Sequence, residues 1–146
     1  MFVRKRLRGE SMSFTVVQSV RTAAGPRQKV VASWSTLVRE DSYFYHPAMS
    51  DALSHAEKFT TIYQRKADYW REALKVSNHP GVVFIPTIGR TMHISRDVAS
   101  RNLAKLERQA AKHQAQADGL RAAISELGNW TWDRSEVSTV DSEPCT

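Results

Sequence analysis

The sequence is poor in the features that mark secreted or membrane-bound proteins. Of its 146 residues only Cys145 is a cysteine, so no internal disulfide can form, which is typical of a reducing, intracellular location. No apolar run reaches the roughly 18 residues that a membrane-spanning helix needs. The basic residues near the start are followed by no apolar segment of the kind that a secretory signal carries. We therefore expect a cytoplasmic protein with no membrane partner.

The arrangements that carry catalysis and ligand binding are also missing. The five histidines stand far apart and show no His-x-x-x-His or Cys-x-x-Cys spacing, so no metal site is predicted. Gly81, Gly89 and Gly128 stand alone, which excludes a phosphate-binding loop. Cys145 lacks the positioned base that a nucleophile needs. The sequence therefore predicts a protein that is not an enzyme, with no catalytic residues, no metal and no cofactor.

What the sequence does have is positive charge concentrated in its first quarter. The net charge is +6, and residues 1–39 alone sum to +7, which leaves −1 for the rest of the chain. Such asymmetry is typical of a protein that binds a polyanion, most often nucleic acid. The alternative is a solvated sheet whose cations protect its edges against aggregation. The candidate nucleic-acid-binding residues are Arg4, Lys5, Arg6, Arg8, Arg21, Arg27 and Lys29.

Residues 1–40 are predicted to form a basic β-meander of three strands. Apolar and polar residues alternate over residues 2–8, 13–21 and 27–34, and turn-forming residues separate these segments. The connections are short, which favours antiparallel pairing. In the third strand the alternation assigns Val30, Ala32 and Trp34 to one face. It assigns Arg27 and Lys29 to the other face, beside the N-terminal arginines.

The rest of the chain is predicted to form a long antiparallel helical hairpin, so the fold class is α+β. An aromatic linker at 41–50 leads into the hairpin at 51–128, and the first helix runs from a cap at Ser50 or Asp51 to about Val76. The second helix starts after a cap at Ser95 and ends at Gly128. Its core positions repeat at coiled-coil spacing over four heptads: Ala99, Leu103, Leu106, Ala110, His113, Ala117, Leu120, Ile124 and Leu127.

The apolar stripe of this second helix must be buried against the first helix, a second copy of itself, or both. A homodimer is therefore predicted. We interpret His113 as a polar core residue that sets register or pairing rather than as a metal ligand. The predicted self-association residues are Leu103, Leu106, His113, Leu120, Ile124 and Leu127.

Two further segments flank the helices. The connection at 77–94 is too apolar for a solvent loop, so some local order is expected there. Residues 82–85 could form a short strand that Pro86 ends, or a plug, and Phe84, Ile85 and Ile88 could form an apolar interaction site at the helical tip. Residues 129–146 have the composition of an acidic, disordered tail.

The aromatic residues have two interpretations. The first places Trp34 in the sheet core and Trp70 in the helical core, and uses Trp130 and Trp132 to pin the tail. In the second, these tryptophans and the aromatic run at 43–45 stack on bases beside the basic strands. The first is favoured because no alternation of cations and aromatic residues lines one surface.

The stretches "MFVRKRLRG", "SFTVVQSVR" and "GPRQKVVASW" together resemble the opening β-meander of insertion-sequence transposases. The resemblance covers residues 1–36 and implies a module related to mobile elements that touches DNA. The ribonuclease-H-like catalytic core of those transposases has no counterpart here, so neither transposase activity nor a Mg²⁺ site is implied. The matching residues are Phe2, Val3, Arg4, Val17, Ser19, Arg21, Gly25, Pro26, Arg27, Gln28, Val30, Val31 and Ala32.

These observations leave two functions open. The first is a non-enzymatic DNA-binding accessory or regulatory protein, which contacts phosphates with little choice of sequence. The alternative is a protein-interaction adaptor that works through the helical hairpin and has no role with nucleic acid.

Overall fold

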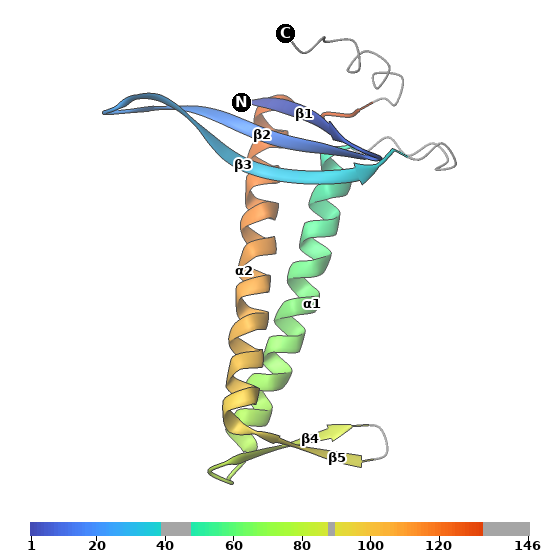
Figure 1. Ribbon diagram of the computed structural model, residues 1–146, viewed down its shortest axis with the longest axis vertical. Helices are drawn as coiled ribbons and strands as arrows, with labels where there is room; N and C mark the ends of the chain where they lie inside the picture. Colours follow the sequence, from blue (N-terminus) through green and yellow to red (C-terminus); the bar gives the residue numbers. More distant parts are fainter. Residues whose placement is uncertain (39–47, 88–89, 133–146) are drawn as a thin grey trace. The chain divides into compact units, whose positions relative to one another are not determined.

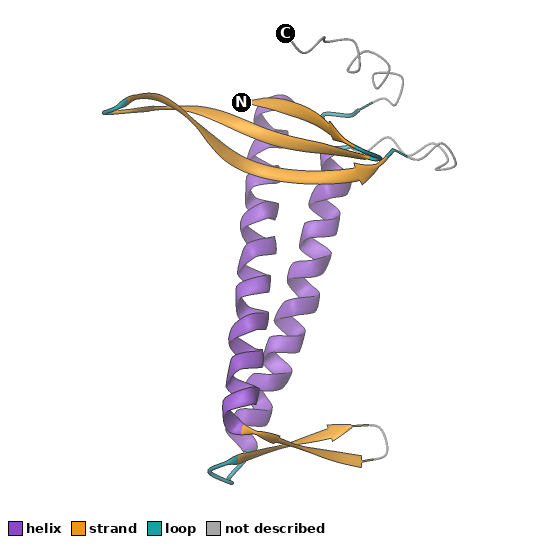
Figure 2. Cartoon of the chain, viewed as in Figure 1, coloured by secondary structure: helices purple, strands orange, loops and turns teal. Residues whose placement is uncertain are grey.

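The computed structural model describes residues 1–38, 48–87 and 90–132. It confirms the α+β class, with a three-stranded antiparallel sheet followed by two helices that pack together (Figure 1). Figure 2 shows a second, two-stranded sheet in the connection between the helices. The elements, in chain order, are β1 (Phe2–Arg8), β2 (Ser11–Thr22), β3 (Gly25–Leu37), α1 (Met49–Val76), β4 (Val82–Thr87), β5 (Arg90–Ser95) and α2 (Arg96–Leu127).

The chain forms two compact units. The first, here called the sheet unit, comprises Met1–His55 and Gln116–Thr146, so the sheet shares a unit with the start of α1 and the end of α2. The second, here called the helical unit, comprises Ala56–Ala115. Most of the predicted aromatic linker at 41–50 lies outside the described residues.

The three-stranded sheet is a meander in the order β1-β2-β3, as predicted. β1 has the predicted bounds, whereas β2 and β3 are longer than the alternation indicated. Val3 and Leu7 of β1 pair with Val16 and Met12 of β2, and this face carries the core. The alternation of β1 and β2 into a core face and an outer face is therefore confirmed.

β3 carries one residue more than β2 near its centre. Val16 pairs with Ala32 and Val17 pairs with Val30, so Val31 is the additional residue of a β-bulge. Arg27 and Lys29 pair with β2 residues on the core face, whereas Val30 lies on the outer face and is 60% exposed. The prediction that Arg27 and Lys29 share a face with the N-terminal arginines is wrong, because the bulge reverses the alternation and leaves no mark in the residue pattern.

An aromatic cluster forms the core of the sheet unit. The Phe14 ring stacks on Trp34 with 5.3 Å between ring centroids, and the rings of Trp130 and Trp132 lie 5.3 and 5.4 Å from it. Trp132 is 2% exposed. The placement of Trp34 in the sheet core is therefore confirmed, and Trp130 and Trp132 pack in the same cluster. The predicted tail boundary at 129 is too early, and the rest of that tail lies outside the described residues.

The segment after α2 also caps the start of α1. The amide of Met49 donates to the carbonyl of Trp130, and the amide of Ser50 donates to Asn129 Oδ1, both at 2.9 Å. Asp51 Oδ2 accepts from the amide of Ala48 at 3.3 Å. The first amides of a helix have no partner within it, and these bonds supply partners. The cap position is therefore Ala48, and the prediction of Ser50 or Asp51 was two or three residues late.

The bounds predicted for α2 are confirmed. Ser95 Oγ accepts from the amide of Val98 at 3.3 Å, as an N-cap does. Gly128 follows the last helical residue with a φ of 75°, and its amide donates to the carbonyl of Ile124. Ala99, Ala117 and Leu120 of the predicted stripe are fully buried.

The end of α2 lies close to the bulge of β3. Gly119 packs against Val31, and a Cβ added at this glycine would overlap the Val31 carbonyl oxygen and stand 3.2 Å from Val31 Cγ1. Gln116 Nε2 donates to the carbonyl of Ser33 at 2.8 Å, one helical turn earlier. The absence of a side chain at Gly119 therefore allows the backbones of helix and strand to approach.

The connection between the helices is a β-hairpin, not one short strand. β4 and β5 pair antiparallel, with Phe84 opposite His93. Val83 and Ile85 are buried and form a core with Ala99 of α2. The prediction that Pro86 ends the strand is wrong, since this residue pairs with Thr91. A hairpin has only edge strands, where a residue without an amide hydrogen is tolerated.

Replacing Gly119 with alanine is expected to destabilise the sheet unit by about 1–3 kcal/mol, because the new methyl group meets backbone and not a movable side chain. In an exposed helix the same change stabilises by about 1 kcal/mol. The free energy of unfolding in urea decides between these signs. The exposed Ala122 changed to glycine is the control for helix propensity alone. A stabilised Gly119→Ala chain would contradict the close approach.

Candidate functional site

The outer face of the sheet presents three arginines in a row. Arg4, Arg6 and Arg8 alternate along β1, and all three are exposed. Beside them β2 presents Thr15, Ser13 and Ser11, and β3 continues two of these rows with Ser33 and Ser35. We call this surface the arginine face; its members are Arg4, Arg6, Arg8, Ser11, Ser13, Thr15, Ser33 and Ser35.

The chemistry of the arginine face favours anions. The strand positions on this side of the sheet include no aspartate or glutamate. Guanidinium groups donate several hydrogen bonds in a fixed geometry that suits phosphate, and hydroxyl groups add further donors. The hydroxyl of Ser11 is already used, since it donates to the carbonyl of Thr36 at 3.4 Å. Alternate residues of a strand stand about 6.8 Å apart, which is twice the 3.4 Å axial rise per phosphate of one DNA strand.

At one end of this face an arginine bridges two strands. Arg4 Nη2 donates to Gln28 Oε1, which joins β1 to β3 across β2. Both residues lie on the same side of the sheet as Val17, which is only 2% exposed between Phe2 and Val30. The guanidinium of Arg4 is therefore held on the outer face.

The structure divides the predicted nucleic-acid-binding residues between the two faces. Arg21 shares the outer face with the three arginines of β1, close to the β2–β3 turn, where it pairs with Pro26. Lys5 pairs with Phe14 on the core face, although it is exposed. Arg27 and Lys29 also lie on that side. One surface therefore carries Arg4, Arg6, Arg8 and Arg21, and the opposite side carries Lys5, Arg27 and Lys29.

The predicted self-association residues are partly used within the chain. Leu120 is fully buried in the sheet unit. In the helical unit the imidazole of His113 stacks on the rings of Phe59 and Tyr63 of α1, with centroid separations of 5.4 and 5.5 Å. His113 thus helps to pair α2 with α1. The half-buried positions are Leu103, Leu106, His113, Ile124 and Leu127.

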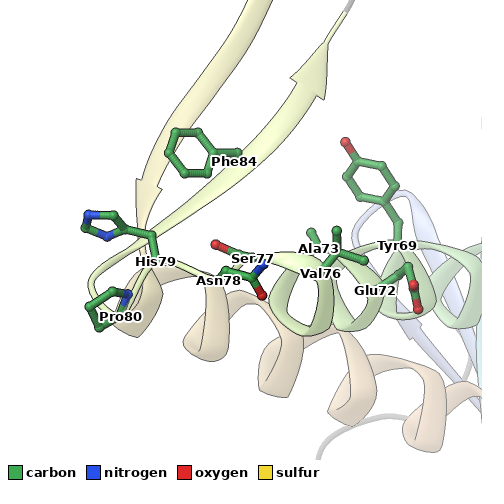
Figure 3. A pocket seen from close by; sticks show the side chains of 9 residues that line it. All are labelled: Tyr69, Glu72, Ala73, Val76, Ser77, Asn78, His79, Pro80 and Phe84. Atoms are coloured by element: carbon green, nitrogen blue, oxygen red, sulfur yellow. The ribbon is translucent and has the colours of Figure 1, made fainter.

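A second candidate surface is an apolar groove in the helical unit, with a volume of about 740 Å³ (Figure 3). Its floor is the last two turns of α1, where Tyr69, Ala73 and Val76 recur at helical spacing. Phe84 of β4 and His79 of the preceding turn also line it, and their rings lie 6.4 Å apart between centroids. Val76 is 65% and Phe84 44% exposed. Glu72 is the one carboxylate of the lining.

Arg96 holds this end of the hairpin together. Its guanidinium donates to the carbonyls of Leu74, Ser77 and His79, at 2.9, 3.3 and 3.4 Å. The last carbonyls of a helix have no partner within it, and a cation there also suits the helix dipole. The turn that lines the groove is thereby tied to the first residue of α2.

The groove is only partly the apolar tip site that the residue pattern predicted. Phe84 lines it, but Ile85 is buried in the core at 4% exposure, and Ile88 lies outside the described residues. Tyr69 and Val76 were missed because they lie off the buried stripe of α1. Their spacing of seven residues beside an apolar connection is the signal that could have found them.

Across residues 1–38, 48–87 and 90–132, no three His, Cys, Asp or Glu side chains are grouped to hold a metal ion. Among the same residues, no helix has the length and apolar character to span a membrane. Hydrogen bonds to Glu107 and Asp68 raise the pKa of Arg71, and the bond to Glu107 joins α1 to α2.

Replacing Phe84 with serine is expected to remove most binding of an apolar fluorescent dye, because Phe84 is the wall of the groove and its removal opens it to water. The measurement is dye fluorescence on the full chain, with circular dichroism to confirm folding. Val98→Ser is the control, since Val98 is 37% exposed outside this groove. Equal dye binding by the Phe84→Ser and native chains would show that the groove is not an apolar site in solution.

Comparisons with known proteins found no relative of this chain. No family model matches the chain, and neither a curated protein nor a solved structure matches it.

Proposed function

We propose that the protein is a non-enzymatic DNA-binding accessory or regulatory protein that contacts duplex phosphates through the arginine face. The observation that carries this proposal is the alignment of Arg4, Arg6 and Arg8 on one exposed strand beside two rows of hydroxyl groups. Such contacts provide affinity and register but read no sequence. Binding is therefore weakly selective.

The small contribution of these arginines to stability supports a binding role for them. They stand on the face opposite the aromatic core, and exposed charged groups contribute little to stability. Three like charges close together on one strand also repel each other, and an anion relieves that repulsion. The edge-protection alternative accounts for charge on β1 but not for the hydroxyl rows on β2 and β3.

The resemblance of residues 1–36 to the opening meander of insertion-sequence transposases supports the same proposal. It makes a module related to mobile elements the favoured origin, working in the cytoplasm on DNA. The arginine face uses Arg4 of that resemblance and adds Arg6 and Arg8 in the same strand.

Changing Arg4, Arg6 and Arg8 together to glutamine is expected to weaken the affinity for duplex DNA by about tenfold or more at low salt. Each lost phosphate contact should also reduce the slope of log affinity against log salt by about 1. Fluorescence anisotropy of a labelled duplex at two or more salt concentrations measures both quantities.

The matched control removes the same charge elsewhere. Arg65, Lys105 and Lys112 are exposed on the helices of the helical unit, and their change to glutamine lowers the net charge equally. This control chain should keep the native affinity and slope. A native chain that does not bind duplex DNA at low salt, or binds it without regard to salt, removes the proposal.

The adaptor function is a second candidate because of one observation, the exposed apolar groove beside Val76 and Phe84. Large exposed apolar side chains gathered in one hollow are typical of a protein-interaction site. This candidate uses the helical unit alone. The adaptor function becomes the favoured candidate if the glutamine variant of the arginine face binds duplex DNA with the same affinity and salt dependence as the native chain.

Self-association through α2 is also a proposal. Because Leu120 is fully buried within one chain, its change to glutamine should unfold the sheet unit. Leu106 is half-buried, and its change to glutamine should halve the sedimenting mass of a homodimer while the helix content stays. Sedimentation equilibrium measures the mass. A native chain that sediments as a monomer at high concentration contradicts the homodimer.

A further inference from the structure

The β2–β3 hairpin extends past the end of β1 as a two-stranded ribbon. β1 pairs only as far as Val17, opposite Phe2, and the two strands continue together from Gln18 and Lys29 to the turn (Figure 1). We call residues 18–29 the ribbon arm. A two-stranded ribbon buries little of its own surface, and the arm contributes no residue to the aromatic core. The aromatic core is thus complete without the arm.

The arm is basic and carries no acid. Arg21, Arg27 and Lys29 are exposed, and the other nine residues of the arm are uncharged. Its turn, Ala23 and Ala24, and the adjoining Gly25 are small, and Thr22 Oγ1 donates to the carbonyl of Gly25 at 2.7 Å. A narrow tip without bulky or acidic side chains can approach a polyanion closely.

The bulge distributes these cations over both faces of the arm. Arg21 lies on the face that continues the arginine face, whereas Arg27 and Lys29 lie on the opposite side, with Val20 and Gln18 as cross-strand partners. A duplex laid flat against one face reaches only the cations of that face. In a groove, base edges form the floor below the ribbon, and one row of phosphates runs along each of its two sides. Side chains on both faces of the ribbon can then reach DNA.

The dimensions select one groove. Paired strands lie about 4.8 Å apart. The major groove of B-form DNA is about 12 Å wide and admits a two-stranded ribbon, whereas the minor groove is about 6 Å wide. The ribbon arm also carries the groups that bond base edges there, since lysine and arginine pair with guanine and glutamine pairs with adenine. Resting on the proposed function, we propose that residues 18–29 enter the major groove of duplex DNA, with Arg27 and Lys29 as the principal contacts inside it.

The test compares three forms of one duplex bound by the full chain. In the first form the DNA is unmodified. In the second, glucosylated 5-hydroxymethylcytosine fills the major groove, and in the third netropsin occupies the minor groove. We expect glucosylation to weaken binding by about tenfold, as the loss of one or two groove contacts would. We expect netropsin to leave the affinity unchanged.

Two variants attribute the effect to the arm. The double change Arg27→Gln and Lys29→Gln should lose most of the sensitivity to glucosylation, and the thermal unfolding midpoint should stay, because both side chains are exposed. The control pair Arg65→Gln and Lys105→Gln removes the same charge from the helical unit and should keep that sensitivity.

The outcomes separate this inference from the function on which it rests. Duplex binding that is indifferent to glucosylation, or that netropsin displaces, overturns the major-groove placement and leaves binding through the arginine face intact. A double variant that keeps the full glucosylation effect also overturns the role of Arg27 and Lys29. A native chain that binds none of the three duplexes removes the proposed function itself.

Discussion

The sheet unit depends on the β-bulge at Val31. At this residue the backbone of β3 comes so close to α2 that only a glycine, Gly119, fits opposite its carbonyl oxygen. Beyond the bulge the two faces of β3 exchange, which turns Arg27 and Lys29 away from the arginine face. One irregularity of the backbone therefore controls both how helix and strand pack and how the positive charge is divided. Bulges commonly combine such roles, since they add twist and redirect side chains.

The sheet unit is built from both ends of the described chain, and polar and apolar contacts join them. The carbonyl of Trp130 and the side chain of Asn129 accept from the first amides of α1, while Trp132 fills the space next to Phe14. A buried helix end without partners would cost several hydrogen bonds. The partners of the first amides of α1 therefore come from residues far away in the sequence.

The two candidate surfaces are those that folding leaves unused. In the sheet unit the outer face has cations and hydroxyl groups, while the aromatic cluster lies on the other face. In the helical unit Val83 and Ile85 point into the core, and Phe84 between them is left to line the groove. Alternation in a strand makes this unavoidable: every second residue of β1 and β4 must face away from the core.

The local pattern of residues was enough to predict the helices, the meander and the caps at Ser95 and Gly128, because each depends on neighbours within a few positions. It also predicted that Arg4, Arg6 and Arg8 share a face, since β1 has no bulge. The local pattern did not predict three features: the face of Arg27 and Lys29, the cap at Ala48 and the second strand of the connecting hairpin. The face of Arg27 and Lys29 depends on the unpaired residue Val31, and the start of α1 depends on Asn129 and Trp130, which are distant in the sequence. The second hairpin strand was missed although its partner, β4, directly precedes it in the sequence.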